Sequence, residues 1–173
     1  MVLIGFMGTG KSVVGRRLAA VTGRRFVDTD RQIEQRAGKS VAAIFRDEGE
    51  ARFRERESEV VASLAGQEGC VIATGGGMAL RPDQIKELGG IRVALTASPE
   101  VILERTKRRR QTRPLLSGED RAAKIRRLLA ERAPYYRLAD LAVDTSQMSV
   151  DETVRLIQMR IDALEAGRSA DTR

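Results

Sequence analysis

The sequence predicts an α/β fold, a five-stranded parallel sheet flanked by helices on both faces. Short apolar segments alternate five times with amphipathic helical segments, and no internal repeat or low-complexity linker interrupts that order. The 173 residues can bury one sizeable core and are few for two. We therefore expect a single domain over residues 1–165 and a disordered tail over residues 166–173.

The first strand leads into a glycine-rich loop. The apolar run over residues 2–4 precedes GFMGTGKS over residues 5–12, which fits the phosphate-loop pattern of Gly, four residues, and Gly-Lys-Ser/Thr. Glycines let backbone amides converge on an anion, and the next helix adds the positive end of its dipole. A chance glycine-rich turn is the alternative. It is disfavoured because a strand pattern precedes the loop and apolar residues at helical spacing follow it until Gly23: Val13, Val14, Leu18 and Val21.

This loop predicts a nucleotide with a bound Mg²⁺. Lys11 would place a point charge on the β- and γ-phosphates, and the Ser12 hydroxyl would bind the metal ion. The nucleotide-binding residues that the motif predicts are Gly8, Thr9, Gly10, Lys11, Ser12 and Val13.

The second strand is expected at residues 25–27 and ends in two carboxylates, Asp28 and Asp30. Ligands of open α/β sheets bind beyond the carboxyl ends of the strands. Such a pair suits recognition of hydroxyl groups, proton acceptance or metal binding through water. The alternative is structural: Thr29 or Asp30 would cap the N-terminus of the helix that contains Ile33.

Two helices should follow. Ser40 is a good N-cap for the first, Gly49 interrupts it, and the second runs from Glu50 to about Ala65. Its apolar side chains, expected to face inward, are Phe53, Val60, Val61 and Leu64. Its charged side chains, expected to face largely outward and to pair with one another, are Arg52, Arg54, Glu55, Arg56 and Glu57.

A buried strand over residues 71–74 breaks into three glycines, Gly75, Gly76 and Gly77. Consecutive glycines at this position indicate very close approach to the backbone, either by a neighbouring chain segment or by a substrate. At the carboxyl edge of the sheet we favour a substrate. The single cysteine, Cys70, begins this apolar run and is expected to be a buried, unreactive thiol.

A helix from Pro82 to Leu88 and a strand over 91–96 should follow, and then a helix capped by Ser98 with Pro99 at its first position. The next helix, over 119–131, breaks or restarts at Pro134. After it we expect a strand over 141–144, a loop over 146–149 and a final helix containing Val154, Ile157, Ile161 and Leu164. Residues 107–118 are basic and contain Pro and Gly, which is poor core material. They read as a mobile flap that could close over phosphates, although Lys107 to Arg110 also fit a solvated loop.

Composition narrows the function. The chain has no His, which removes Ser-His-Asp, Cys-His and zinc-hydrolase chemistry. Its net charge of +7 favours an anionic partner, but with 3% aromatic residues a nucleic-acid partner is not expected. No apolar run is long enough to cross a membrane and no signal peptide precedes the first strand, so we expect a cytoplasmic protein without a membrane partner.

Taken together, the motifs resemble those of the shikimate kinase family over about residues 1–160. After the phosphate loop no single motif is specific, but the ordered set is: Asp28-Thr29-Asp30, Phe53-Arg54 with Glu57, Gly75-Gly76-Gly77, Arg113-Pro114-Leu115-Leu116 and Arg132-Ala133-Pro134-Tyr135-Tyr136. The resemblance implies a P-loop kinase fold with strand order 2-3-1-4-5. It also implies transfer of the γ-phosphoryl of ATP to the 3-hydroxyl of shikimate, by a monomer.

The same resemblance implies roles for individual residues. Asp30 would bind the ring hydroxyls and is a candidate to accept the proton of the attacking one, and Asp28 would hold a Mg²⁺-bound water beside Ser12. The substrate-binding residues it implies are Asp30, Arg54, Gly75, Gly76, Gly77 and Arg132, in which the two arginines bind the carboxylate. With Lys11 and Asp30, Arg113 completes the catalytic set by closing on the ATP phosphates.

One departure concerns the adenine side, where Ser146-Gln147-Met148-Ser149 lacks the Arg and the Asn-Pro pair that the family often carries. Two rival functions share the scaffold: another small-metabolite kinase, such as a gluconate kinase, and a catalytically silent nucleotide-binding protein. Asp30, Arg54, Gly76 and Arg132 together favour a cyclic hydroxy acid as the substrate, which argues against a gluconate kinase. Retention of every catalytic residue argues against the second.

Overall fold

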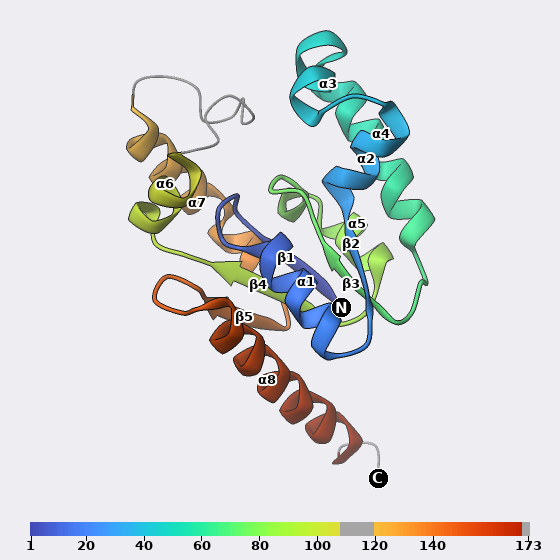
Figure 1. The fold of residues 1–173 in the computed structure, drawn as a ribbon, viewed down its shortest axis with the longest axis vertical. Helices are drawn as coiled ribbons and strands as arrows, with labels where there is room; N and C mark the ends of the chain where they lie inside the picture. The colour runs from blue at the N-terminus through green and yellow to red at the C-terminus, as the bar shows by residue number, and fades with distance from the viewer. Residues whose placement is uncertain (108–119, 171–173) are drawn as a thin grey trace.

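The computed structural model describes residues 1–107 and 120–170. Within them a parallel sheet has the order β2-β3-β1-β4-β5 (Figure 1). Its strands are β1 (Val2–Gly5), β2 (Arg25–Asp28), β3 (Cys70–Ala73), β4 (Arg92–Thr96) and β5 (Leu141–Asp144). The predicted fold class and strand order are confirmed.

Two helices, α1 (Lys11–Val21) and α8 (Val150–Ala170), cover one face of the sheet (Figure 1). Because side chains alternate along a strand, Leu3 of β1 points to this face and packs in one apolar cluster with Leu18 of α1 and Ile157 of α8. All three side chains are fully buried. This packing fixes the start of α1 directly beyond β1, and so places the glycine-rich loop.

The larger cluster lies on the other face. There Val2 and Ile4 of β1 pack with α4 (Gly49–Leu64), α5 (Pro82–Leu88), α6 (Pro99–Thr106) and α7 (Arg121–Tyr136). The helices α2 (Thr29–Ala37) and α3 (Val41–Asp47) extend beyond the carboxyl edge of the sheet on the side of α4, and α6 and α7 lie on the opposite side (Figure 1). A short 3-10 helix, η1 (Met78–Leu80), follows the glycine triplet.

Several local predictions are confirmed. The Ser40 hydroxyl accepts from the Ala43 amide at 3.2 Å, and the Ser98 hydroxyl from the Val101 amide at 3.3 Å, so both serines are N-caps. Pro82 begins α5. Cys70 is buried, with 3% of its surface exposed.

Three predictions about helix ends are corrected. The N-cap of α2 is Asp28 itself, whose carboxylate accepts from the Arg31 amide, because the Thr29 hydroxyl is buried and accepts from the Gly75 amide at 3.0 Å. Helix α7 continues through Pro134. Helix α8 continues to Ala170, so the segment expected to be a disordered tail from residue 166 is helical up to that point.

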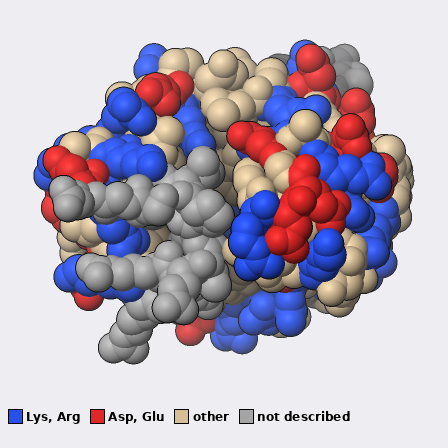
Figure 2. Space-filling view, turned by 90° about the horizontal axis from the view of Figure 1, so that it is seen from above, with Lys and Arg blue, Asp and Glu red and all other residues tan. Residues whose placement is uncertain are grey.

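The charged face of α4 is largely as expected, with one exception. Arg52 pairs with Glu55 at 2.6 Å and Arg56 with Glu48 at 2.9 Å, and acidic and basic side chains lie next to one another on the surface in Figure 2. Glu57, however, has 0% of its surface exposed. The expectation that it faces outward is wrong, because arginines from two elements surround its carboxylate inside the protein.

The flap prediction cannot be compared, since Arg113 and nearly all of residues 107–118 lie outside the described part of the chain. Lys107, which is described, is exposed and pairs with Glu104. Across residues 1–107 and 120–170, none of the helices is both long and apolar enough to cross a membrane.

Candidate active site

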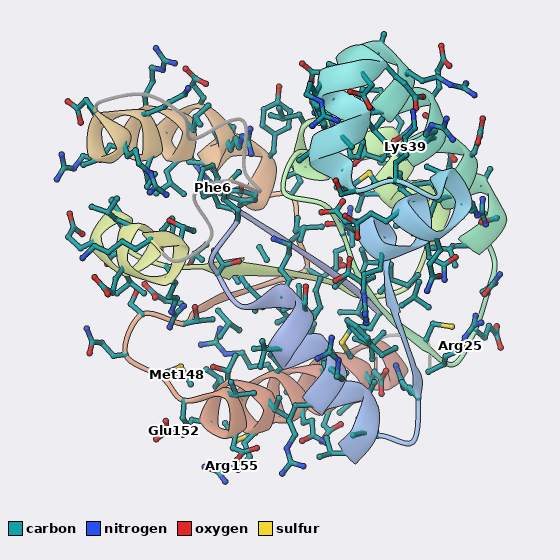
Figure 3. The ribbon with its side chains drawn as sticks, turned by 45° about the horizontal axis from the view of Figure 1, so that its top comes forward. Phe6, Arg25, Lys39, Met148, Glu152 and Arg155 are labelled. Atoms are coloured by element: carbon teal, nitrogen blue, oxygen red, sulfur yellow. The ribbon has the colours of Figure 1, made fainter. Side chains whose placement is uncertain are left out.

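A cavity of about 930 Å³ opens at the carboxyl edge of the sheet. The register places the ends of several strands there together, since Asp28 of β2 lies beside Ala73 of β3, and Gly5 of β1 beside Leu95 of β4. The loop after β1, the first turn of α2, the glycine triplet, one face of α4 and the loop after β5 all line it. Met148 marks this last loop, before α8 (Figure 3).

The glycine-rich loop has the conformation that an anion cradle requires. Gly8 and Gly10 have φ angles of 84° and 96°, which L side chains rarely adopt. The Thr9 side chain is buried and donates to the Phe6 carbonyl at 2.8 Å, so it holds the loop and only its backbone can reach a ligand. Lys11 Nζ donates to the carbonyls of Gly5 and Phe6 at 2.8 and 2.9 Å, which folds the ammonium group over the loop.

The predicted metal residues meet in the structure. The Ser12 hydroxyl donates to Asp28 Oδ2 at 2.7 Å, and both residues line the cavity beside the loop. One hydroxyl and one carboxylate are hard oxygen groups, which fit a Mg²⁺ that keeps most of its waters. No group of three or more His, Cys, Asp or Glu able to hold a metal occurs in residues 1–107 and 120–170.

Asp30 lies in the first turn of α2 and its carboxylate is buried. Oδ1 has no hydrogen-bond partner. Burial, chiefly, and the nearby carboxylates of Asp28, Glu57 and Glu34 raise the pKa of Asp30 to about 6, while Lys11 acts in the opposite direction. A buried acceptor without a donor is costly, and the residue that carries this oxygen lines the cavity. It is also a stronger base than an ordinary carboxylate.

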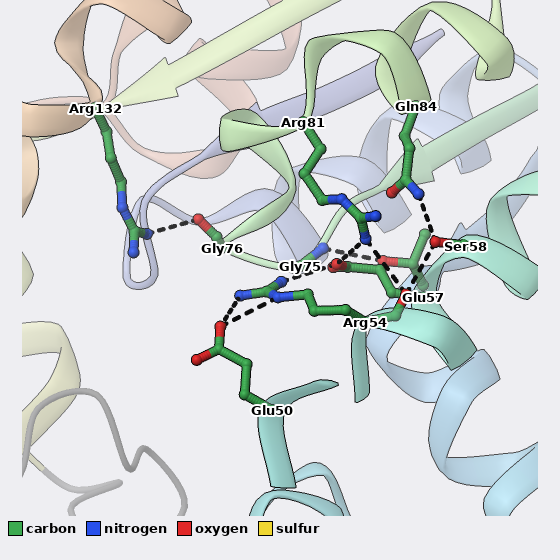
Figure 4. Close-up of polar contacts among 10 residues, drawn as sticks. Glu50, Arg54, Glu57, Ser58, Gly75, Gly76, Arg81, Gln84 and Arg132 are labelled. Carbon is green, nitrogen blue, oxygen red and sulfur yellow. Dashed lines mark hydrogen bonds and ion pairs between the residues drawn. The ribbon is translucent and has the colours of Figure 1, made fainter. Parts of the chain in front are cut away.

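Arg54 is held between two carboxylates of its own helix. Its Nη1 donates to Glu57 Oε2 at 2.8 Å, whereas Nε and Nη2 donate to Glu50 Oε1 at 3.2 and 2.9 Å (Figure 4). Glu57 is buried, but the Glu50 side chain is 61% exposed and ends on the open side of the guanidinium. The edge that Glu50 occupies is thus able to bind a carboxylate, and Arg54 itself lines the cavity.

The glycine triplet packs against these side chains. A Cβ on Gly75 would lie 2.5 Å from Asp30 Oδ1, and a Cβ on Gly77 would lie 2.8 Å from Arg54 Nη2. The groups that approach Gly75 and Gly77 so closely therefore belong to this chain. At Gly75 and Gly77 a neighbouring segment of the chain thus makes a close approach; all three glycines line the cavity, and their contact with a substrate stays a prediction.

Arg132 reaches the same region from α7 but stays behind the cavity wall. Its Nη1 donates to the Gly76 carbonyl at 2.8 Å, its guanidinium lies 5.1 Å from the centre of the Phe6 ring, and only 4% of the residue is exposed. It does not line the described cavity. The structure thus brings Asp30, Arg54 and the glycines together and joins Arg132 to them through Gly76.

Sequence reasoning missed several residues at the site. Arg105 of α6 lines the cavity and donates to the Thr145 hydroxyl and carbonyl at 2.9 and 2.7 Å. The Thr145 hydroxyl in turn donates to the Thr9 carbonyl at 3.0 Å, which ties the glycine-rich loop to the end of β5. Thr145 directly follows a strand, so the rule that ligands bind at strand ends could have indicated it. No local signal marks Arg105.

The comparisons with known proteins agree with this geometry. The family model described as "Shikimate kinase" matches residues 7–162. A shikimate kinase from Desulforudis audaxviator is 48% identical, over 99% of this chain and 93% of its own. One from Pelotomaculum thermopropionicum is 50% identical, over 91% of this chain and 92% of its own.

The chain belongs to the shikimate kinase family.

Among solved structures, a shikimate kinase from Acinetobacter baumannii in complex with shikimate has a TM-score of 0.88 and 39% identity, and the match covers 94% of this chain and 92% of that one. The shikimate kinase family therefore accounts for nearly the whole chain, including every element that lines the cavity. Membership makes the chain an ATP-dependent kinase.

Proposed function

We propose that this protein transfers the γ-phosphoryl group of ATP to the 3-hydroxyl of shikimate, which gives shikimate 3-phosphate and ADP. The observation that carries the proposal is the presence, in the lining of one cavity, of a phosphate loop, the arginine Arg54 and the carboxylate residue Asp30. Shikimate has a carboxylate and three hydroxyls, so these two groups can fix its orientation from opposite ends.

The nucleotide would occupy the side of the cavity between the glycine-rich loop and the start of α8. Backbone amides of residues 8–13 would bind the phosphates, with Lys11 supplying positive charge. Arg105, Met148 and Val150 line this end and offer a planar cation and apolar contacts to a base. These residues would contact the base in place of the Arg and the Asn-Pro pair that the loop over residues 146–149 lacks.

At the metal position, Ser12 and Asp28 would hold Mg²⁺, with Asp28 acting through water. The ion would supply charge neutralisation to the phosphates. We propose that Arg113 adds a further positive charge there. These groups stabilise a loose transition state, in which positioning and electrostatics outweigh covalent chemistry.

At the acceptor end, Arg54 would bind the substrate carboxylate, and the Gly76 backbone that Arg132 holds would complete the wall. Asp30 would accept a hydrogen bond from the ring hydroxyls. As the 3-hydroxyl oxygen bonds to the γ-phosphorus and ADP leaves, the hydroxyl proton passes to the Asp30 carboxylate. A pKa of about 6 suits this role, because Asp30 is then largely ionised at neutral pH and still basic enough to take a proton.

A coupled ADP-release assay tests the proposal. The enzyme with MgATP is run alone, with shikimate and with gluconate. We expect turnover that depends on shikimate. Turnover with gluconate instead would indicate another metabolite kinase, and no acceptor-dependent turnover with tight MgATP binding would indicate a silent nucleotide-binding protein. A monomeric state, a cytoplasmic location and the lack of nucleic-acid or membrane partners stay predictions.

A further inference from the structure

Arg81, directly after η1, lies outside the cavity and contacts Arg54 and Glu57, two of the residues that line it. Its Nη1 donates to the backbone carbonyl of Arg54 at 3.3 Å and lies 3.7 Å from Glu57 Oε2 (Figure 4). Glu57 Oε2 is the same oxygen that Arg54 Nη1 binds at 2.8 Å. One buried carboxylate is therefore shared between two guanidinium groups, of which only Arg54 lines the cavity.

The contact sits within a wider attachment of α5 to α4. Gln84, on the first turns of α5, donates to the Ser58 hydroxyl, and that hydroxyl donates to the Arg54 carbonyl at 2.9 Å (Figure 4). Arg81 and Gln84 thus both act on the same turn of α4. The side chain of Arg81 is 35% exposed, so it is anchored but not enclosed.

Charge balance gives this contact a consequence for the substrate. Arg54 carries one positive charge but faces two carboxylates, Glu50 and Glu57, and the Asp30 carboxylate lies nearby against Gly75. An incoming substrate carboxylate would meet no net attraction from Arg54 and Glu57 alone. With Arg81 as a second cation on Glu57, the group of Arg54, Glu57 and Arg81 carries a net charge of +1, which attracts the acid as it displaces Glu50 from Arg54.

We propose that Arg81 is a positioning residue for binding of the substrate acid: it offsets the charge of Glu57 and fixes the backbone of Arg54, so that the Arg54 guanidinium is available to the carboxylate of the acceptor. The inference rests on the proposed function. It concerns a residue that does not itself line the cavity, and which acts through Arg54 and Glu57.

Two variants separate charge from hydrogen bonding. Arg81→Gln keeps a donor but removes the charge, and Arg81→Lys keeps the charge. Lys86→Met serves as the control, because it removes one positive charge from an exposed position on α5. Steady-state kinetics with shikimate and with ATP are measured for all four proteins, together with the melting temperature.

We expect Arg81→Gln to raise the KM for shikimate about tenfold, the size expected for one partly screened charge interaction, with the KM for ATP and kcat within about twofold of the parent. Arg81→Lys should recover most of that loss, and Lys86→Met should match the parent. The inference is overturned if the Gln variant keeps the parent KM for shikimate, if the Lys variant is as poor as the Gln variant, or if both substrates lose equally as the melting temperature falls. A parent enzyme without shikimate-dependent turnover would refute the proposed function instead.

Discussion

Replacing Asp30 by Asn should make the protein more stable at neutral pH while it removes the candidate base. The ionised carboxylate of Asp30 is buried and Oδ1 lacks a donor, whereas in the unfolded chain the same group is solvated. Its pKa is therefore raised, from 3.8 to about 6. Folding is opposed whenever the side chain is ionised, because the native state holds the charged form poorly.

The pH window follows from these two values. Below about pH 4 the carboxyl is protonated in both states and costs nothing, and the cost grows as pH rises through the interval between the two pKa values. Above about pH 6 this cost to the free energy of folding is nearly complete. It amounts to about 3 kcal/mol at pH 7 and to about 1 kcal/mol at pH 4.5. Asn has the same shape without the charge, so Asp30→Asn should gain these amounts.

Urea unfolding of the parent and of Asp30→Asn at pH 7 and pH 4.5 measures the difference directly. Asp162→Asn, at an exposed position of α8, is the matched control and should stay within about 0.5 kcal/mol of the parent at both pH values. A gain for Asp30→Asn that is equal at the two pH values would refute the reasoning, since a change in packing does not depend on pH. A loss at pH 7 would show that the ionised carboxylate stabilises the fold.

Three further predictions concern activity. Because Asp30 must be ionised to accept the proton, kcat/KM for shikimate should fall about tenfold for each pH unit below pH 6, and a profile that is flat down to pH 5 would exclude that role. Arg132→Ala should raise the KM for shikimate by more than about tenfold and leave the KM for ATP nearly unchanged, because the lost charge-assisted bond holds Gly76; equal losses for both substrates would contradict this role. Glu50→Gln should lower the KM for shikimate by up to about fivefold, since an exposed ion pair no longer competes for Arg54, and a raised KM would show that Glu50 supports the arginine instead.

The part of the candidate site that contains the glycine-rich loop could be predicted from local sequence. The glycine-rich loop, Lys11 and Ser12 are adjacent in the chain, and the conformations of Gly8 and Gly10 follow from having no side chain. That Asp28 lies beside Ser12 was implied by the family resemblance, and the two are hydrogen-bonded at 2.7 Å. For the loop itself, the spacing of residues along the chain was sufficient.

The part of the candidate site around Arg54 and Asp30 could be predicted only partly from the sequence. The charge of Glu57 suggested a surface position, although this residue lies four residues after Phe53 and three before Val60, on the apolar face of α4. Its burial depends on Arg54 from the same helix and on Arg81, directly after η1, a partner that no helical pattern can indicate. The raised pKa of Asp30 likewise follows from burial and from which carboxylates surround it, and neither is visible in the motif.

By itself the sequence determined the fold class and the phosphate loop, because a local motif and the order of strands and helices encode them. The tertiary structure alone decided that Arg54 shares Glu57 with Arg81, that Arg132 binds the Gly76 carbonyl, and that Arg105 lines the cavity from α6. The physical reason is that charge balance, burial and pKa are sums over neighbours in space, and those neighbours come from segments that are far apart along the chain.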